Sequence, residues 1–202
     1  TCADDVPGCA GPLAAGDHAS ANLVVPFSFT APEGWTNIRD VDRSYTMETS
    51  SGIAAPVQVM AMNAIADQTP ECGPTAKAGA GHTVQDFVDF VRTHPGLDTT
   101  DPVPVEVDGY RGQSIDLSVA STWTTRCPNR LGPFVLLLTD TGVPAKRALG
   151  YEADQLARWD IIDVNGETVI IERAVSSYGG KFDEAAAAAQ PIIDSIRFTP
   201  SN

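Results

Sequence analysis

The side chains best suited to catalysis in this sequence are one serine and three histidines. Ser114 stands in the run Gly112-Gln113-Ser114-Ile115-Asp116, which resembles the G-x-S-x-G elbow of serine hydrolases but lacks its second glycine. His18, His82 and His94 are too widely spaced for the H-E-x-x-H arrangement that binds zinc on one helix. We therefore expect no catalytic residues of these kinds and no metal site.

Acidic residues are the other candidates for chemistry, because most glycosidases use two carboxyl groups. Candidate pairs are Asp98 with Asp101, Asp160 with Asp163, and Asp183 with Glu184. A chain of 202 residues with 26 acidic ones contains such pairs by chance, and Asp160 and Asp163 would lie on opposite faces of a strand. The sequence has no phosphate-binding glycine loop and no calcium loop either, so we expect no cofactor.

Aromatic side chains suggest binding more than catalysis. Trp35 and Trp159 are expected to fill the core of a sheet, whereas Trp123 lies in a polar loop beside a cysteine. We expect a ligand groove near Trp123, Arg126 and Tyr110. Replacing Trp123 with alanine would then weaken ligand binding and leave the thermal stability nearly unchanged, whereas a large loss of stability would make Trp123 a core residue.

Four cysteines, Cys2, Cys9, Cys72 and Cys127, have no C-x-x-C spacing and no histidine at zinc-ligand spacing. They allow three pairings. We favour Cys2–Cys9 with Cys72–Cys127, because the first pair closes a short Pro/Gly loop and the others lie in longer loops. Disulfides require an oxidising compartment, so we expect an extracytoplasmic protein, secreted or anchored to the outer face of the cell membrane.

Charge and hydropathy restrict the partners. The 13 basic and 26 acidic residues give a net charge of −13, which repels nucleic acids and anionic lipids. No apolar run approaches the ~20 residues of a membrane span. Because the chain begins at Thr1 and not at Met, we expect that a leader or anchor has been removed. The expected partner is an unknown protein or small molecule, with no nucleic acid and with membrane contact only through such an anchor.

The predicted elements form one domain. Residues 1–22 are rich in Ala, Gly and Asp without periodicity, and they are predicted to be an arm or stalk before a single domain over 23–202. Helices are predicted over 84–94, where Thr83 and Asp86 can form a capping box, and over 184–196. Strands are predicted near 27–29, 38–47, 57–61, 103–107, 111–119, 134–138, 159–164 and 167–172. This order predicts an α+β fold, an antiparallel β-sheet flanked by two main helices.

Three segments, Phe27–Trp35, Val107–Gly112 and Ala189–Phe198, resemble secreted or membrane-anchored actinobacterial domains of unassigned function. Their order is similar to that of the PsbP-like fold, which includes LpqN-type lipoproteins. The resemblance covers about residues 23–199. It implies a PsbP-like sandwich of antiparallel sheet and helices that acts as a binding or docking module, and it supplies no catalytic residues to carry over.

These observations favour a non-enzymatic, extracytoplasmic module of the cell envelope that binds a ligand or a protein. One alternative is the sensory ectodomain of a larger membrane protein. The other is a secreted hydrolase that uses dispersed carboxylates or a serine and histidine pair, whose groups would have to converge in one cleft.

Overall fold

The computed structural model describes residues 10–49, 56–128, 130–140, 148–153, 155–176 and 182–199. Within these ranges it contains two helices, α1 (Val84–Thr93) and α2 (Phe182–Ser195). Its strands are β1 (Gly11–Pro12), β2 (Gly16–Ala19), β3 (Phe27–Ala31), β4 (Trp35–Val41), β5 (Ser44–Thr49), β6 (Val57–Met60), β7 (Ala64–Ile65), β8 (Leu97–Thr99), β9 (Val103–Val107), β10 (Tyr110–Val119), β11 (Phe134–Thr139), β12 (Ala148–Glu152), β13 (Gln155–Val164), β14 (Glu167–Ser176) and β15 (Arg197–Phe198).

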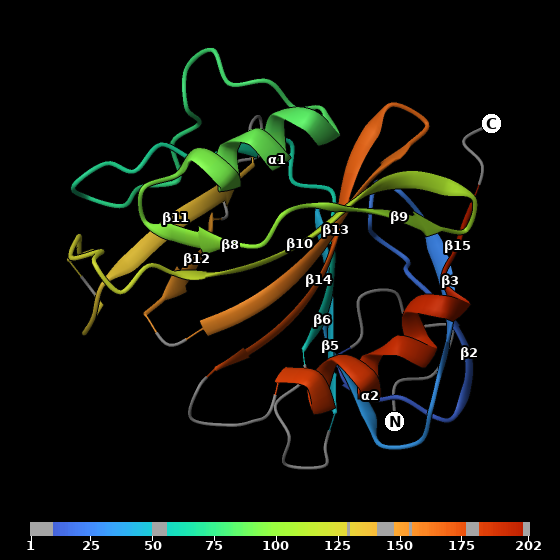
Figure 1. Ribbon diagram of the computed structural model, residues 1–202. Coiled ribbons are helices and arrows are strands. Elements are labelled where there is room, and N and C mark those ends of the chain that lie inside the picture. Colours follow the sequence, from blue (N-terminus) through green and yellow to red (C-terminus); the bar gives the residue numbers. More distant parts are fainter. Residues whose placement is uncertain are drawn as a thin grey trace.

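A nine-stranded antiparallel sheet runs through the middle of the molecule (Figure 1). Its order is β1-β4-β5-β6-β14-β13-β10-β8, and β9 pairs with the first half of β10. The long strands β13 and β14 form a hairpin whose turn residues, Asn165 and Gly166, have φ angles of 56° and 92°. A type I′ turn needs positive φ at both positions, so the hairpin predicted from the Asn-Gly pair is confirmed.

Each face of this central sheet is covered by one helix and one small sheet. On one face, α1 and the sheet β12-β11-β7 enclose a core that includes Phe87, Leu137 and Trp159. On the other face, α2 and the sheet β15-β3-β2 enclose a core that includes Phe27 and Ile192. Figure 1 shows α1 and α2 on opposite sides of β13 and β14. The central sheet therefore separates two hydrophobic cores.

The predicted fold class, an α+β sheet flanked by two main helices, is wrong. Of the residues that the structure describes, 50% are in strands and 14% in helices, and the strands form three antiparallel sheets. The prediction missed the two covering sheets, whose strands β2, β7, β12 and β15 have two to five residues each. Strands this short contain too few residues to show a period of two. The fold is largely β.

The helix α1 agrees with its sequence signals. The Thr83 side chain accepts a hydrogen bond from the N–H of Asp86, and the Asp86 carboxylate accepts one from the N–H of Thr83, so the capping box is confirmed. The residues buried on its inner face are Phe87, Val88, Phe90 and Val91. The helix α2 contains Pro191, as the sequence predicts.

Residues 10–22, the second half of the predicted arm, form hydrogen bonds with the rest of the domain. β1 pairs with β4, and β2 pairs with β3. The Asp40 carboxylate accepts hydrogen bonds from the N–H groups of Ala21, at 2.7 Å, and Asn22, at 3.2 Å. Leu13 is buried in the core beneath α2. These contacts fix the described part of this segment against the central sheet.

Candidate functional site

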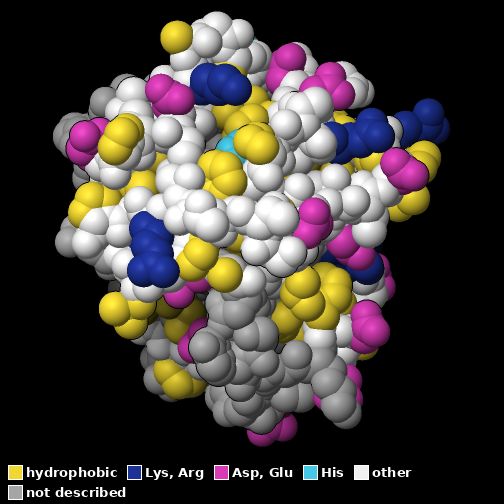
Figure 2. Space-filling view, turned by 60° about the vertical axis from the view of Figure 1, so that its left-hand side comes forward, with side chains coloured by type: hydrophobic (Ala, Val, Ile, Leu, Met, Phe, Trp, Pro, Cys, Tyr) yellow, Lys and Arg dark blue, Asp and Glu magenta, His cyan; other side chains and the backbone are white. Residues whose placement is uncertain are grey.

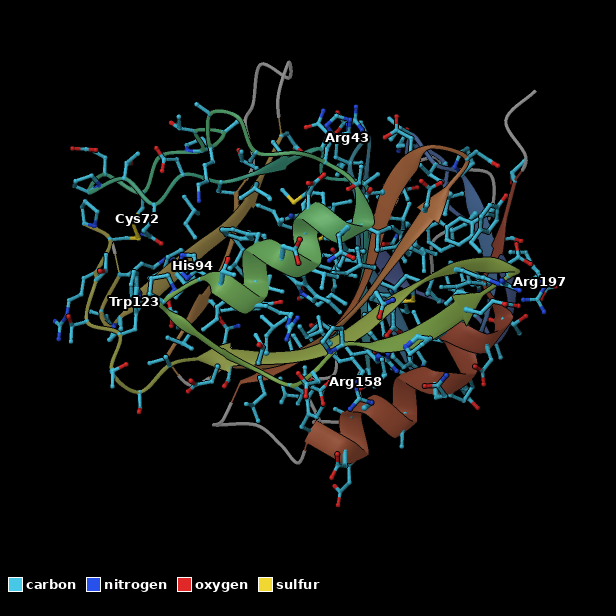
Figure 3. The ribbon with its side chains drawn as sticks, turned by 45° about the horizontal axis from the view of Figure 1, so that its top comes forward. Arg43, Cys72, His94, Trp123, Arg158 and Arg197 are labelled. Atoms are coloured by element: carbon cyan, nitrogen blue, oxygen red, sulfur yellow. A yellow bond between two sulfur atoms is a disulfide. The ribbon has the colours of Figure 1, made fainter. Side chains whose placement is uncertain are left out.

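The face of the central sheet beneath α2 contains a cavity of about 380 Å³. Residues of α2 and of the strands β9, β10, β13 and β14 line it. Figure 3 shows one of them, Arg158, between the strands and α2, away from Cys72, His94 and Trp123. The polar residues on which the chemistry depends are Ser114, Arg158, Asp160, Arg173, Gln190 and Asp194.

Strand register brings the charged residues of this cavity together. Asp116 of β10 lies opposite Arg158 of β13, which lies opposite Arg173 of β14. One step along, Ser114 lies opposite Asp160. Directly paired residues, and residues two apart on a strand, point to the same face. Five polar side chains from three strands therefore share the face that α2 covers.

A buried ion pair is at the centre of this group. The side chains of Arg173 and Asp160 are 7% and 3% exposed, and Nη2 of Arg173 donates to Oδ2 of Asp160. Ser114 Oγ donates to the other carboxylate oxygen at 2.5 Å, and Arg173 Nη1 donates to Gln190 Oε1 at 2.9 Å. Burial lowers the pKa of Arg173, and the charge of Asp160 opposes that effect.

A second, more exposed ion pair lies beside the first. Arg158 donates from Nε and Nη2 to both carboxylate oxygens of Asp116, at 2.5 Å and 2.8 Å. These hydrogen bonds raise the pKa of Arg158 above its usual value. The guanidinium also lies 5.6 Å from the ring of Phe182 on α2. Arg158 is therefore held on both sides, between a strand and the first residue of the helix.

One donor in the buried pair is unused. Nε of Arg173 is buried and has no hydrogen-bond partner in the described structure. A buried N–H without an acceptor is costly, so such groups in native proteins usually meet a partner. On α2, Gln190, Ile193 and Asp194 are three and four residues apart, which places them on one helix face above the cavity. The cavity thus lies between the buried Arg173 guanidinium and a face of α2 that carries Gln190 and Asp194.

Sequence reasoning considered Ser114 and Asp160 separately and did not predict that they meet. A signal was present, because Ser114 and Asp116 flank the apolar Ile115 of β10, and Arg158 and Asp160 flank the apolar Trp159 of β13. The structure does not bring Ser114 to a histidine, since none is among the described residues that line the cavity. The Ser114 hydroxyl donates to a carboxylate, an arrangement that orders side chains and does not supply an imidazole base.

The predicted groove residues Trp123, Arg126 and Tyr110 are not brought together. Trp123 and Arg126 follow β10, and Tyr110 begins it, so a ten-residue strand of roughly 33 Å separates them. Tyr110 packs against Phe198 with ring centres 5.6 Å apart and accepts a hydrogen bond from Asn165. Arg126 is exposed. Only Trp123 and Arg126 lie in the same loop.

Trp123 packs like a structural residue. Its ring meets His94 edge to face at 5.5 Å, its Nε1 donates to the carbonyl oxygen of Phe134 at 3.0 Å, and it packs against the α1 core. Burial lowers the pKa of His94, and the charge of Lys77 lowers it further. A Cβ on Gly96 would lie 2.7 Å from the Trp123 ring, so the two residues are in close contact.

Replacing Trp123 with alanine is expected to lower the free energy of unfolding by about 2 kcal/mol, roughly half of what a fully buried tryptophan costs. The reason is the loss of the ring contacts with His94 and Gly96. Urea denaturation measures it, with Arg126→Ala in the same loop as the control that should change little. If the urea midpoint of the Trp123 variant equals that of the wild type, Trp123 is not a core residue and remains a candidate for ligand binding.

The disulfide between Cys72 and Cys127 is present, with the two Cα atoms 5.5 Å apart, so this predicted pairing is confirmed. Cys2 and Cys9, the other predicted pair, lie outside the described residues. A disulfide of this kind indicates an oxidising, extracytoplasmic environment. Neither described helix is long and apolar enough to cross a membrane.

The histidines lie in three separate surroundings. His18 Nε2 is 2.8 Å from the carbonyl oxygen of Ala14, and the carbonyl oxygen of His82 accepts a hydrogen bond from Thr168. His94 packs between Phe90 and Trp123. Among the described residues, no group of three or more His, Cys, Asp or Glu side chains could hold a metal ion.

The core beneath α1 contains the buried acid Glu172. Glu172 Oε2 accepts hydrogen bonds from the hydroxyl of Tyr151, at 2.6 Å, and from Nε1 of Trp159, at 3.1 Å. Trp159 Nε1 also donates to the Tyr151 hydroxyl at 2.7 Å. Burial raises the pKa of Glu172 above its usual value, although both hydrogen bonds act in the opposite direction. The network is satisfied from within the core, which makes it structural.

Replacing Glu172 with glutamine is expected to stabilise the protein at neutral pH. The pKa of Glu172 in the folded protein lies above its value in the unfolded chain, which is about 4.3. The stability that this residue contributes is therefore full below about pH 4.3. It falls by about 1.4 kcal/mol for each pH unit between the unfolded and the folded pKa values. The variant should lose this fall. Urea unfolding from pH 4 to 8 measures it, with the exposed Glu167→Gln as the control. A variant whose stability still falls in parallel with the wild type would contradict the assignment.

No protein-family model and no curated protein matches the chain. A solved structure from Bacteroides thetaiotaomicron VPI-5482 is similar, with a TM-score of 0.44 and 8% sequence identity. The match covers 93% of this chain and 50% of the other, so the chain spans half the length of that protein.

Proposed function

We propose that the protein is a non-enzymatic, extracytoplasmic module of the cell envelope that binds a small polar ligand in the cavity beneath α2. The observation that carries this proposal is the hydrogen-bonded group of Arg173, Asp160 and Gln190, which lines a cavity of about 380 Å³. Ligand pockets commonly measure 300–1,000 Å³ and contain a few fixed polar groups. The resemblance to secreted and membrane-anchored domains and the Cys72–Cys127 disulfide support the location.

The polar groups of the cavity are already fixed in position, which favours recognition. Asp160 receives hydrogen bonds from Ser114 and Arg173, and Gln190 holds the other end of the Arg173 guanidinium. Side chains held this way lose little entropy when a ligand binds, and less of the binding energy is spent on ordering them.

Two features favour a small ligand over an added strand or a flat protein surface. β9, which lines the cavity, carries Pro104, which has no N–H, and the exposed charge of Glu106. Both are devices by which sheet edges resist pairing with another chain. On the face that Figure 2 shows, the described hydrophobic side chains form separate spots among polar atoms, not one continuous patch.

The proposal is tested by blocking the cavity. Val103 is 56% exposed and lies opposite Ser114, so a tryptophan at position 103 would project over the cavity. The matched control is Ile38→Trp, at a 42% exposed position on β4 away from the cavity. Both proteins and the wild type are titrated by NMR with L-amino acids, dipeptides, glucose and inorganic phosphate, and native mass spectrometry detects any co-purified compound.

We expect at least one probe to shift resonances of β13 and β14 in the wild type and in Ile38→Trp, and Val103→Trp to abolish that shift. Circular dichroism establishes that both variants are folded. The proposal fails if no probe binds the wild type, or if every bound probe binds Val103→Trp equally well.

A further inference from the structure

We infer that His94 is a pH-dependent switch, whose neutral ring holds residues 120–124, the Trp123 loop, against the end of α1 and whose protonation releases that loop. The loop lies on the α1 side of the central sheet, so this inference does not depend on the cavity beneath α2. It follows from a hydrogen bond that only a neutral ring can accept, from the packing around that ring, and from the contacts that fix the chain beyond the loop.

The ring of His94 accepts a hydrogen bond that it cannot accept when it is charged. The N–H of Gly96 donates to Nδ1 of His94 at 3.1 Å. In a neutral imidazole one ring nitrogen accepts and the other carries the proton, whereas in the charged ring both nitrogens donate. Protonation of His94 would therefore place two N–H groups against each other, and Gly96 would lose its acceptor.

The backbone of Gly96 connects this hydrogen bond to the Trp123 loop. Its carbonyl oxygen accepts a hydrogen bond from the N–H of Ala120 at 2.9 Å, and the carbonyl oxygen of Ala120 accepts one from the N–H of Trp123 at 2.9 Å. A Cβ on Gly96 would lie 2.7 Å from the Trp123 ring, so that ring lies directly on the Gly96 backbone. A displacement of Gly96 would therefore disturb the whole loop.

The groups packed around His94 oppose a charge on its ring. The ring meets Phe90 of α1 edge to face at 5.3 Å and Trp123 at 5.5 Å, and neither of these residues titrates. Figure 3 shows His94 and Trp123 side by side. Burial lowers the pKa of His94, and the charge of Lys77, which lies 5.7 Å from the Phe90 ring centre, lowers it further. These two effects outweigh the carbonyl groups at the end of α1, which would favour a cation.

The chain directly after the loop is held by contacts that do not involve His94. The N–H of Phe134 donates to the carbonyl oxygen of Thr125 at 2.9 Å, Arg126 forms a β-bridge with Pro133, and Cys127 is bonded to Cys72. Protonation of His94 leaves all three contacts in place. The release is therefore a local opening that exposes the rings of His94 and Trp123 to water, and the protein stays folded.

The loop should open as the pH falls. The pKa of His94 in the closed state lies below its value in the open state, which is about 6.5, so the closed state has its full stability above about pH 6.5. As the pH falls from there toward the lowered pKa, the equilibrium constant for opening should rise by up to about tenfold for each pH unit.

The inference is tested by amide hydrogen exchange of the wild type from pH 8 to 5, followed by NMR together with the titration of the His94 ring. After correction for intrinsic exchange rates, the protection of the Gly96 and Ala120 amides should fall by up to about tenfold per pH unit below pH 6.5. Circular dichroism in the same samples should show that the protein remains folded.

Two variants separate the ring proton from a general effect of acid. His94→Asn places an amide oxygen where it can accept from the N–H two residues on, and this side chain does not titrate. Its Gly96 and Ala120 protection should therefore be independent of pH. His82→Asn makes the same change at an exposed histidine outside this contact and should behave as the wild type does.

The wild type alone can overturn the inference, so the result does not depend on either variant being folded. If the His94 ring becomes protonated while Gly96 and Ala120 keep their protection, His94 is not a switch. The same conclusion follows if His94→Asn loses protection in parallel with the wild type, because the acid effect then comes from another group.

Discussion

Replacing Asp160 with alanine is expected to lower the free energy of unfolding by about 3–5 kcal/mol, because the change leaves the guanidinium of Arg173 buried without its counter-charge. Ser114 would lose its acceptor as well. For a chain of this length, the melting temperature should fall by on the order of 10 °C. Urea denaturation at neutral pH gives the free energy, and calorimetry gives the melting temperature.

The neighbouring ion pair provides the control. Asp116 and Arg158 also form a hydrogen-bonded ion pair, but their side chains are 36% and 34% exposed, so Asp116→Ala should cost no more than about 1 kcal/mol. Replacing both buried partners, as Asp160→Leu with Arg173→Met, should recover most of the stability, because no charge is then left unpaired. Equal losses for Asp160→Ala and Asp116→Ala would contradict the importance of burial.

Removing the Cys72–Cys127 disulfide by replacing both cysteines with alanine is expected to cost about 4 kcal/mol, the chain-entropy value for a loop of this length. The sequence separation of 55 residues encloses α1, β8, β9 and β10. Cys127 is also 7% exposed and packs with Phe134 and Leu136, so the change removes buried contacts as well. Guanidinium denaturation of the oxidised protein and the double variant measures the difference.

Reduction of the wild type provides a second route to the same quantity. The wild type in excess dithiothreitol should unfold at nearly the denaturant concentration of the double variant in the same buffer. A double variant as stable as the oxidised protein would show that the folded loop is held by its packing alone.

Local signals in the sequence were sufficient to predict individual helices and hairpins. Thr83 and Asp86 predicted where α1 begins, and the Asn165-Gly166 pair predicted the β13–β14 hairpin, because each signal involves backbone atoms only a few residues apart. The architecture depended on strands such as β7 and β15, which have two residues each and pair with partners far along the chain. Such pairings leave no periodicity, so the covering sheets and the largely β fold were missed.

The candidate site was missed for a related reason. Ser114, Asp160 and Arg173 come from three strands, and their contacts exist only in one register of β10, β13 and β14. A shift of one residue would turn each side chain to the opposite face. The residues expected to form a groove, Tyr110 and Trp123, are close in the sequence, yet an extended strand places them at opposite ends. Proximity along the chain is a poor guide where the chain is extended.

The small sheet β15-β3-β2, which lies beside α2, also determines when folding can finish. In the sheet β15-β3-β2, Phe198 lies opposite Phe27, and both rings belong to one core with Tyr45. That core therefore cannot close until the segment around residue 198 is available to pair with strands made near the start. Contacts so distant in sequence slow folding, because loop-closure entropy is lost before they form. During synthesis or export from the N-terminal end, the half of the molecule that carries the proposed site would be the last to assemble.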